Sequence, residues 1–274
     1  MIPAWFLKIR GEVPRTASLA LGLLPILALL LLWWLGTRGI PEERFVGPTI
    51  LPSPGEVVES LTDLLTASDQ DNRSLFDHIW ISLRRVMMGF LLALAIVLPL
   101  GILMGAFGSV RAVFEPVMTA SGYIPIATLV PLTMSWFGVD EIQKVVFLAM
   151  AFGIYLIPIV VRAVDSVPDL YLRTAYSLGA SRWQVIRRVL VPVASPDLWH
   201  GMRLAFGVGW TYLVLAEVVV KSGGLGDMID TARRRAMSGR VYLVIVIITL
   251  IAWVADVLWK MLGNSLFPYR KGRS

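Results

Sequence analysis

Long apolar runs separated by short polar stretches dominate the chain. Six windows of about 20 residues are mainly apolar, and they lie at roughly 18–35, 86–107, 117–137, 142–162, 198–220 and 241–262. A membrane-spanning α-helix needs about 20 consecutive apolar residues to cross the hydrocarbon core. The pattern therefore predicts an all-α integral membrane protein with six transmembrane helices.

The composition fits this prediction and excludes several other classes of protein. Hydrophobic residues make up 57% of the 274 residues and charged residues only 16%, whereas soluble domains carry about 25% charged residues. The net charge of +6 is typical of basic loops that anchor a membrane protein, so we expect no nucleic-acid partner. The chain has no cysteine, which excludes disulfides and thiolate metal sites.

The distribution of basic residues predicts the topology. Six spans place both termini on one side, and Lys and Arg crowd the short connection 163–197 and the tail 263–274. This bias favours a cytoplasmic location for 1–17 and for the tail, in a bacterial inner membrane. The segment 36–85 is then periplasmic, with an interfacial helix that begins at Ser74 and Asp77 and bends into the second span. The remaining five spans form a core over 86–262.

The third apolar window is interrupted more often than a simple span. Pro116, Gly122, Pro125 and Pro131 all lie in or beside it. A backbone that loses helical hydrogen bonds within the membrane must face protein or a water-filled cavity, and not lipid. We therefore expect a broken helix on the inner wall of a pathway.

A polar stretch between the fourth and fifth windows predicts a bent pair of helices. Gly179 follows "DLYLRTAYSL" and suits the left-handed conformation that ends a helix. Ser181 and Gln184 have the spacing of a capping box, so a second helix is expected to start at once and to end at Pro192. Three exposed arginines are expected on this second helix, namely Arg182, Arg187 and Arg188.

This bent pair resembles the EAA loop of permease subunits in bacterial ABC importers. The resemblance rests on the spacing T-A-x-x-x-G-x(9)-V-x-V-P from Thr174 to Pro192, and it implies a coupling helix that docks on a cytoplasmic ATPase. The residues that it assigns to coupling are Arg173, Thr174, Ala175, Leu178, Gly179, Ala180 and Ser181. Arg173 departs from the glutamate of the family motif, so an ion pair made by that glutamate must be absent or reversed.

Other segments resemble the nitrate, sulfonate, taurine and bicarbonate branch of the same permeases. They include "LPSPGEV", "GYIPIATLVPLTMSWFG" and "SGGLGDMI". The resemblance implies the type I importer (MetI-like) fold and a pathway for a small anionic solute. It also implies a second permease copy, two ATPase subunits and a periplasmic or lipid-anchored solute-binding protein.

The energy source must lie on another chain. The sequence contains no G-x-x-x-x-G-K-[ST] motif that could cradle the phosphates of a nucleotide. We therefore expect a non-catalytic subunit that binds no cofactor itself, with ATP and Mg²⁺ held by the partner ATPases. The alternatives are a secondary transporter or channel that works without an ATPase, and an intramembrane enzyme, for which no catalytic constellation is visible.

Polar and aromatic residues in the broken third window and the glycine-rich fifth are candidates for the pathway. These candidates are Tyr123, Thr128, Thr133, Trp210, Thr211 and Glu217. For Glu217 the favoured interpretation is structural, as a carboxylate paired with Lys221 or a neighbouring helix, and the alternative is a gate or solute contact. Asp256, four residues before Lys260, is interpreted as structural in the same way.

Overall fold

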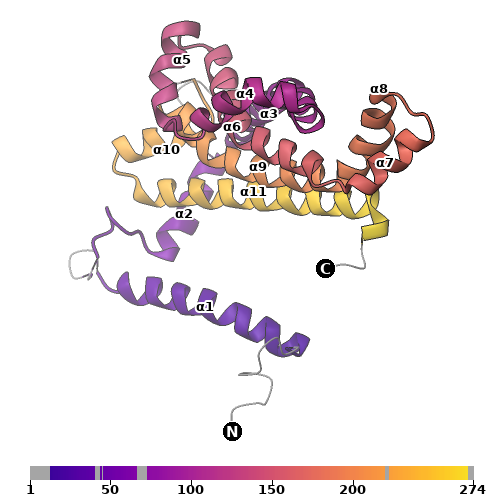
Figure 1. Cartoon of the computed structure of the whole chain (residues 1–274). Helices are drawn as coiled ribbons and strands as arrows, with labels where there is room; N and C mark the ends of the chain where they lie inside the picture. The colour runs from indigo at the N-terminus through magenta and orange to yellow at the C-terminus, as the bar shows by residue number, and fades with distance from the viewer. Residues whose placement is uncertain (1–12, 41–43, 45, 67–72, 220–221, 271–274) are drawn as a thin grey trace. The chain divides into compact units, whose positions relative to one another are not determined.

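The computed structural model describes residues 13–40, 44, 46–66, 73–219 and 222–270. Every regular element among these residues is a helix (Figure 1), as the apolar pattern predicts. The chain divides into two compact units: unit 1 is Met1–Thr66 with Ala232–Leu243, and unit 2 is Ala67–Thr231 with Val244–Ser274.

Unit 1 contains an exposed apolar helix and a short amphipathic one. Helix α1 spans Arg15–Gly36, and none of its most apolar window is buried. An exposed apolar helix of this length suits a lipid environment. Helix α2 spans Pro54–Thr66. Trp33 at the end of α1 donates an indole hydrogen bond to the Pro52 carbonyl at 2.8 Å, which ties the two segments together.

Unit 2 is built around three long helices: α3 (Leu75–Ala106), α6 (Glu141–Asp165) and α9 (Val191–Val218). Helix α6 packs against both of the others, with glycines at the crossings. Gly101 of α3 lies against Val160, and Gly201 of α9 lies against Ile159, so closely that an added Cβ would overlap either neighbour. Small residues at such crossings allow apolar helices to approach within van der Waals contact in a membrane.

The predicted break in the third window is confirmed. Helix α4 (Gly108–Ser121) and the segment Ile126–Phe137, which contains α5 (Leu129–Phe137), meet at an angle of 89°. The chain turns at Gly122–Pro125, where Pro125 has an extended backbone conformation that cannot continue a helix.

Four of the described helices are long and apolar enough to cross a membrane, or five if the bent pair counts as one span. These four include α1, α3 and α6, together with α11 (Ser238–Leu266). Helix α9 has the length of a span but contains Pro192, Pro196, Asp197 and Arg203 in its first half, which lowers its hydropathy. A multi-pass membrane protein is therefore confirmed, while the count of six spans stays a prediction.

The helix predicted to start at Ser74 and to run on into the second span is α3, a single 32-residue helix capped by Ser74 and Asp77 as predicted. One predicted helix boundary is wrong. The helix that starts after Ser181 does not end at Pro192 but continues into α9. The predicted connection 163–197 is therefore shorter, because α6 extends to Asp165 and α9 begins at Val191. A short helix, α10 (Leu225–Arg234), follows Gly223 and Gly224.

Candidate functional site: the elbow between α6 and α9

The bent helix pair lies between α6 and α9, at the end of unit 2 opposite α5 (Figure 1). Its first helix, α7, spans Asp169–Ser177, and its second, α8, spans Arg182–Val185. We call residues 168–192 the elbow. Asp169 in the first turn of α7 interacts favourably with the positive end of the helix dipole.

The turn at Gly179 has the hydrogen bonds of a Schellman motif. Gly179 has φ of +78°, in the left-handed region that favours glycine. The Ala180 N–H donates to the Ala175 carbonyl at 3.1 Å, and the Gly179 N–H donates to the Tyr176 carbonyl at 2.9 Å. The predicted left-handed stop is therefore confirmed, and it satisfies carbonyls that the end of α7 would otherwise leave unpaired.

The restart of the helix is confirmed as well. Gln184 Oε1 accepts a hydrogen bond from the Ser181 N–H at 2.8 Å, as the predicted capping box requires. Stop and restart are separated only by Gly179, Ala180 and Ser181. The bend is consequently fixed by backbone hydrogen bonds on both sides.

The passage through Pro192 explains why the second helix does not end there. Residues Ile186–Leu190 form a π-helical turn, in which the Val191 N–H donates to the Ile186 carbonyl five residues back. In a regular α-helix the ring of Pro192 would clash with the carbonyl of Arg188. The wider π turn immediately before the proline relieves that clash, so the helical backbone continues from α8 into α9 without a break.

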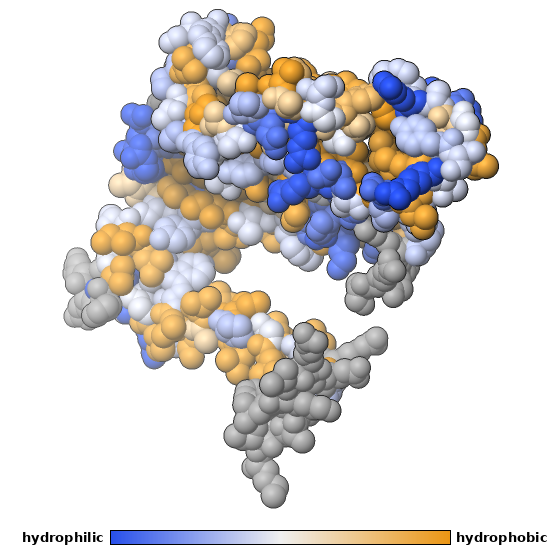
Figure 2. Space-filling view, viewed as in Figure 1, coloured by the Kyte–Doolittle hydropathy of each residue, from blue (hydrophilic) through white to orange (hydrophobic). Residues whose placement is uncertain are grey.

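One face of the elbow packs on the core and the other is open. Leu172, Ala175 and Ala180 contact a buried apolar cluster formed by the end of α6 and the start of α9. The elbow also exposes five large apolar or aromatic side chains, which we call the elbow rim. They are Leu170, Tyr171, Tyr176, Leu178 and Trp183, with Leu178 83% exposed. Figure 2 shows hydrophilic and hydrophobic residues side by side on this part of the surface.

All seven residues predicted for coupling lie together in the elbow. Ala175 and Ala180 are half-buried against the core, and Arg173, Thr174, Leu178, Gly179 and Ser181 are exposed. The three arginines of the second helix are also exposed, as predicted. The sequence did not separate the exposed rim from the buried face, because both contain apolar residues.

The other end of unit 2 holds a buried ionic cluster that sequence reasoning missed except for Glu217. Arg85 of α3 donates to Glu217 Oε1 of α9 at 2.7 Å and forms an ion pair with Glu141 of α6. Ser82 and the Gly226 N–H donate to the same Glu217 carboxylate at 2.8 Å. Arg85, Lys144 and Glu217 are each no more than 1% exposed, so the cluster joins three helices by fully enclosed charges.

The loop 222–226 completes this ionic cluster. Arg85 donates to the Gly223 carbonyl at 2.6 Å, and Lys144 donates to the Ser222 hydroxyl. Lys221, the predicted partner of Glu217, lies outside the described residues, and Arg85 is the partner within them. The consecutive basic pair Arg84–Arg85 at the start of an apolar run was the available signal in the sequence.

The structure does not gather the six pathway candidates at one point. Tyr123, Thr128 and Thr211 are exposed on the chain, whereas Thr133, Trp210 and Glu217 are buried. Thr133 accepts a hydrogen bond from Gln143 at 2.9 Å, and Trp210 packs edge-on against Phe206.

Asp256 has a structural environment, but its partner differs from the expected Lys260. Arg203 of α9 donates to both carboxylate oxygens of Asp256 on α11, at 2.6 and 2.7 Å. Such a bidentate pair fixes the two helices relative to each other.

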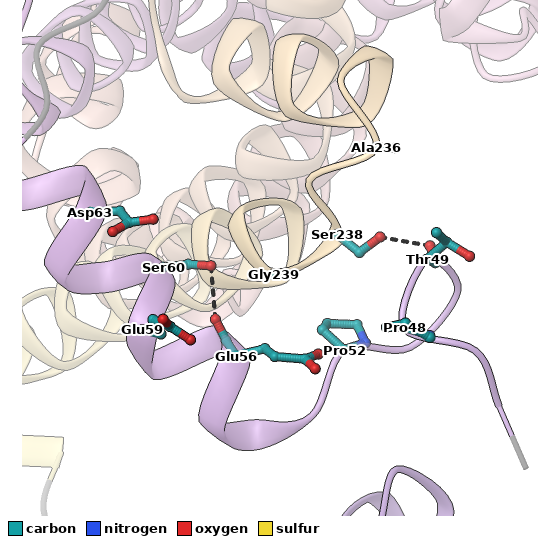
Figure 3. Close-up of a pocket in the computed structure, with 10 residues that line it drawn as sticks. All are labelled: Pro48, Thr49, Pro52, Glu56, Glu59, Ser60, Asp63, Ala236, Ser238 and Gly239. Carbon is teal, nitrogen blue, oxygen red and sulfur yellow. Dashed lines mark hydrogen bonds between the residues drawn. The ribbon is translucent and has the colours of Figure 1, made fainter. Parts of the chain in front are cut away.

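Unit 1 carries an acidic groove of about 360 Å³ between the 48–52 segment, α2 and the start of α11 (Figure 3). Glu56, Glu59 and Asp63 line it, and Ser238 donates to the Thr49 carbonyl at its edge. Burial raises the pKa of Glu56, but hydrogen bonds from the Ser53 backbone and from Arg44 outweigh this effect, so its pKa is lowered overall. Two of the three carboxylates have a cationic partner, because Arg240 also lies 3.7 Å from Asp63.

Comparison with known proteins identifies the family. A family model described as "Binding-protein-dependent transport system inner membrane component" matches residues 97–267. The chain is 31% identical over 263 residues to the taurine transport system permease protein TauC of Escherichia coli (strain K12), covering 96% of this chain and 94% of that one. It is 30% identical to the putative aliphatic sulfonates transport permease protein SsuC of Bacillus subtilis (strain 168), covering 82% and 80%.

A solved structure shows the same fold. An inward-facing form of the MetNI methionine ABC transporter matches with a TM-score of 0.63 at 18% identity, over 70% of this chain and 95% of that one. The type I importer fold expected from the sequence is thereby confirmed. From these matches the chain belongs to the binding-protein-dependent inner membrane components, the non-catalytic permease subunits of ABC importers, which work with separate ATPase and solute-binding subunits.

Proposed function

We propose that the elbow is the surface on which the ATPase subunit docks. The observation that carries this proposal is the elbow rim, where Leu170 and Leu178 are 71% and 83% exposed although the bend that carries them is held by a Schellman motif and a capping box. An exposed cluster of large apolar side chains with charged neighbours is typical of a protein contact surface. The proposed contacts are the seven predicted residues: Arg173, Thr174, Ala175, Leu178, Gly179, Ala180 and Ser181.

The elbow is built to transmit a displacement into the membrane core. Its buried face shares one apolar cluster with Val164 and Val167 at the end of α6, and Ile186 and Leu190 carry this cluster to the start of α9. Because the π turn keeps α8 continuous with α9, a push on the rim moves both long helices together. ATP binding and hydrolysis in the partner subunits would then shift the permease between two helix arrangements through their different contacts with the elbow.

The assembly that we propose contains two copies of this chain, two ATPases and an external binding protein, periplasmic or lipid-anchored. ATP and Mg²⁺ bind to the ATPases, and this chain holds no cofactor. The elbow and both termini face the cytoplasm. In support, Trp259 near the end of α11 contacts Trp199 near the start of α9, which brings the end of α11 to the elbow side of unit 2.

The proposed solute is a small organic sulfonate such as taurine. The names of the two relatives support this class. A path for such an anion should present neutral hydrogen-bond donors and no unpaired carboxylate. The pairing of Glu217 with Arg85 meets that condition, so we assign Glu217 to the ionic cluster and retain Tyr123, Thr128, Thr133, Trp210 and Thr211 as proposed pathway residues.

Reconstitution of the complete transporter tests this function. The chain, its ATPase and its binding protein in proteoliposomes should accumulate labelled taurine only when ATP is present on the ATPase side. Leu178→Glu should lose copurifying ATPase and reduce uptake by at least about 10-fold, because a carboxylate replaces an apolar contact. Tyr269→Glu is the matched control, since Tyr269 is similarly exposed outside the elbow.

Two results would count against the proposal. Retention of the ATPase and of uptake by Leu178→Glu would remove the elbow as the docking surface. Uphill uptake by this chain without an ATPase would instead support the secondary-transporter alternative.

A further inference from the structure

Two tyrosines form a polar contact on the open side of α6 and α9. The Tyr155 and Tyr212 hydroxyl oxygens lie 2.9 Å apart, and their ring centroids are 6.1 Å apart. Tyr155 is 38% exposed and Tyr212 is half-buried. A pair of hydroxyl groups on the outer face of two apolar helices needs a polar environment or a polar partner.

Tyr155 lies near the middle of α6. Tyr155 follows Glu141 by fourteen positions and precedes Asp165 by ten, which corresponds to about 21 and 15 Å along α6. Gly209 lies against Phe152 and Gly201 against Ile159, so α9 runs antiparallel to α6 and passes Tyr155 at mid-span. Tyrosines that anchor a protein at the membrane surface lie at the two interfaces instead.

One hydroxyl group of the pair can still donate a hydrogen bond to a ligand, and the neighbouring part of α9 is open. Two phenols carry two O–H donors, and their mutual bond uses one of them. The second O–H can donate to an acceptor that reaches this face. On α9, Thr211 next to Tyr212 is exposed, and nothing lies within 4 Å of a Cβ added at Gly207, one turn earlier.

Building on the proposed function, we infer that the Tyr155–Tyr212 pair is a solute contact in the pathway. One phenol O–H donates to a sulfonate oxygen of the crossing solute, and the bond between the tyrosines orients that donor. Charge-assisted hydrogen bonds to an oxyanion are strong, yet a neutral phenol leaves no fixed charge in the membrane that would need its own counter-ion. A neutral donor of this kind can therefore bind the anion during its passage and still release it.

Cysteine labelling tests the position of the pair independently of the solute. The chain has no native cysteine, so Tyr155→Cys and Tyr212→Cys each create a single reactive site per permease chain, and labelling is read on the isolated permease band after reaction in the assembled transporter. A methanethiosulfonate that carries an ethylsulfonate is the probe, because it resembles a small organic sulfonate and does not partition into lipid. Leu250→Cys on α11, exposed at an apolar position, is the matched control.

We expect the probe to modify both tyrosine positions but not Leu250→Cys. Labelling of the tyrosine positions only by an apolar maleimide would place them against lipid, and labelling by neither reagent would place them in a closed subunit contact. Either result would overturn the inference.

Removal of the hydroxyls tests their contribution to transport. In the reconstituted transporter, the double variant Tyr155→Phe/Tyr212→Phe should lower taurine transported per ATP hydrolysed by about 10-fold, because a hydrogen bond to a charged group is lost. Its ATPase activity stimulated by the binding protein should stay within about 2-fold, and Tyr269→Phe should change neither quantity. Unchanged transport per ATP by the double variant would refute the contact, as would equal losses of transport and ATPase activity, which indicate a structural role.

The two proposals fail in different ways. If the unaltered transporter moves another solute and no taurine, the assigned substrate class is wrong, while labelling still decides whether the tyrosines line the pathway. If taurine is transported but neither cysteine is labelled, the inference about the tyrosines is wrong and the proposed function stands.

Discussion

The two ends of unit 2 differ in which side chains are buried: one end encloses charged side chains, and the other exposes large apolar ones. At one end, Arg85, Lys144 and Glu217 are enclosed, and the charges are matched within the chain. At the other end, the elbow rim leaves Leu178 and Trp183 in the open while its backbone is held by a Schellman motif and a capping box. At the first end the charged side chains are enclosed by the chain itself, whereas at the second the backbone is hydrogen-bonded but large apolar side chains stay exposed.

This difference indicates that the ionic cluster and the elbow have different roles in the transporter. A buried charge is tolerated only when it is paired and hydrogen-bonded, and such a network has few alternative arrangements. The ionic cluster is therefore expected to hold α3, α6 and α9 together as one body. The exposed side chains of the elbow are expected to be covered by the ATPase. Movement of the ATPase would then act on one end of unit 2, while the ionic cluster holds the helices together at the other end.

The largest expected effect comes from breaking the ionic cluster. Arg85→Met removes the cation between Glu217 and Glu141 and leaves a buried carboxylate unpaired, which should destabilise the protein by about 3–5 kcal/mol. Thermal unfolding of the detergent-solubilised chain, followed by helical circular dichroism, measures this loss.

Two further variants make that result specific to burial. Arg84→Met removes a neighbouring cation that is 51% exposed and 3.6 Å from Glu141, so the cost should stay below about 1 kcal/mol. The double variant Arg85→Met/Glu217→Gln should recover part of the loss, because the unpaired charge is gone. If Arg85→Met and Arg84→Met unfold alike, the ionic cluster does not hold the three helices together.

An intermediate effect is expected at the bend of the elbow. Gly179→Ala forces a side chain into the left-handed region, at a cost of about 1–2 kcal/mol, and Gly179→Pro is incompatible with a φ of +78°. Both should leave membrane insertion intact and reduce ATPase activity stimulated by the binding protein, the proline variant more strongly. Gly108→Ala is the matched control. An added Cβ meets nothing within 4 Å at Gly108 or at Gly179, but only Gly179 has a left-handed φ. Normal coupling in Gly179→Pro would contradict the role of the bend.

The smallest effect is expected at the ion pair of unit 1, in which the Arg44 and Glu56 side chains are 9% and 34% exposed, so that it is less enclosed than the ionic cluster. Arg44 lies 2.7 Å from Glu56, whose pKa is lowered in the folded protein. A depressed pKa contributes stability that is present above the unfolded value of about 4.3 and is lost as the pH falls through the folded value. The contribution should be about 0.5 kcal/mol after solvent screening. Melting temperatures of the native chain and Glu56→Gln should therefore converge in acid, and an equal gap at pH 7 and pH 3 would contradict the assignment.

The local features of the elbow could be predicted because their signals are local. The stop at Gly179 depends on backbone conformation, and the restart depends on Ser181 and Gln184, three residues apart. The broken third window was visible for the same reason, since prolines and glycines interrupt helices wherever they occur. The sequence did not predict that the helix continues past Pro192. The π turn at Ile186–Leu190 makes this possible, and no residue type in that segment signals such a turn.

The ionic cluster could not be predicted because it depends on packing. Arg85 is 56 residues from Glu141 and 132 from Glu217 in sequence, and only the packing of α3, α6 and α9 brings them together. Arg85 lies just before a predicted span and Glu141 just before another, so the apolar pattern places both outside the spans. The sequence therefore pointed to Glu217 alone and favoured the nearest basic residue as its partner.

The most direct test of the docking claim is a cross-link from a single cysteine. Leu178→Cys on the elbow rim and Val139→Cys, exposed beside α5 at the opposite end, can each be coupled to a short photo-reactive thiol reagent in the assembled transporter. The proposed function predicts that Leu178→Cys links to the ATPase and that Val139→Cys does not. A cross-link to the ATPase from Val139→Cys, with none from Leu178→Cys, would contradict the proposal that the ATPase docks on the elbow.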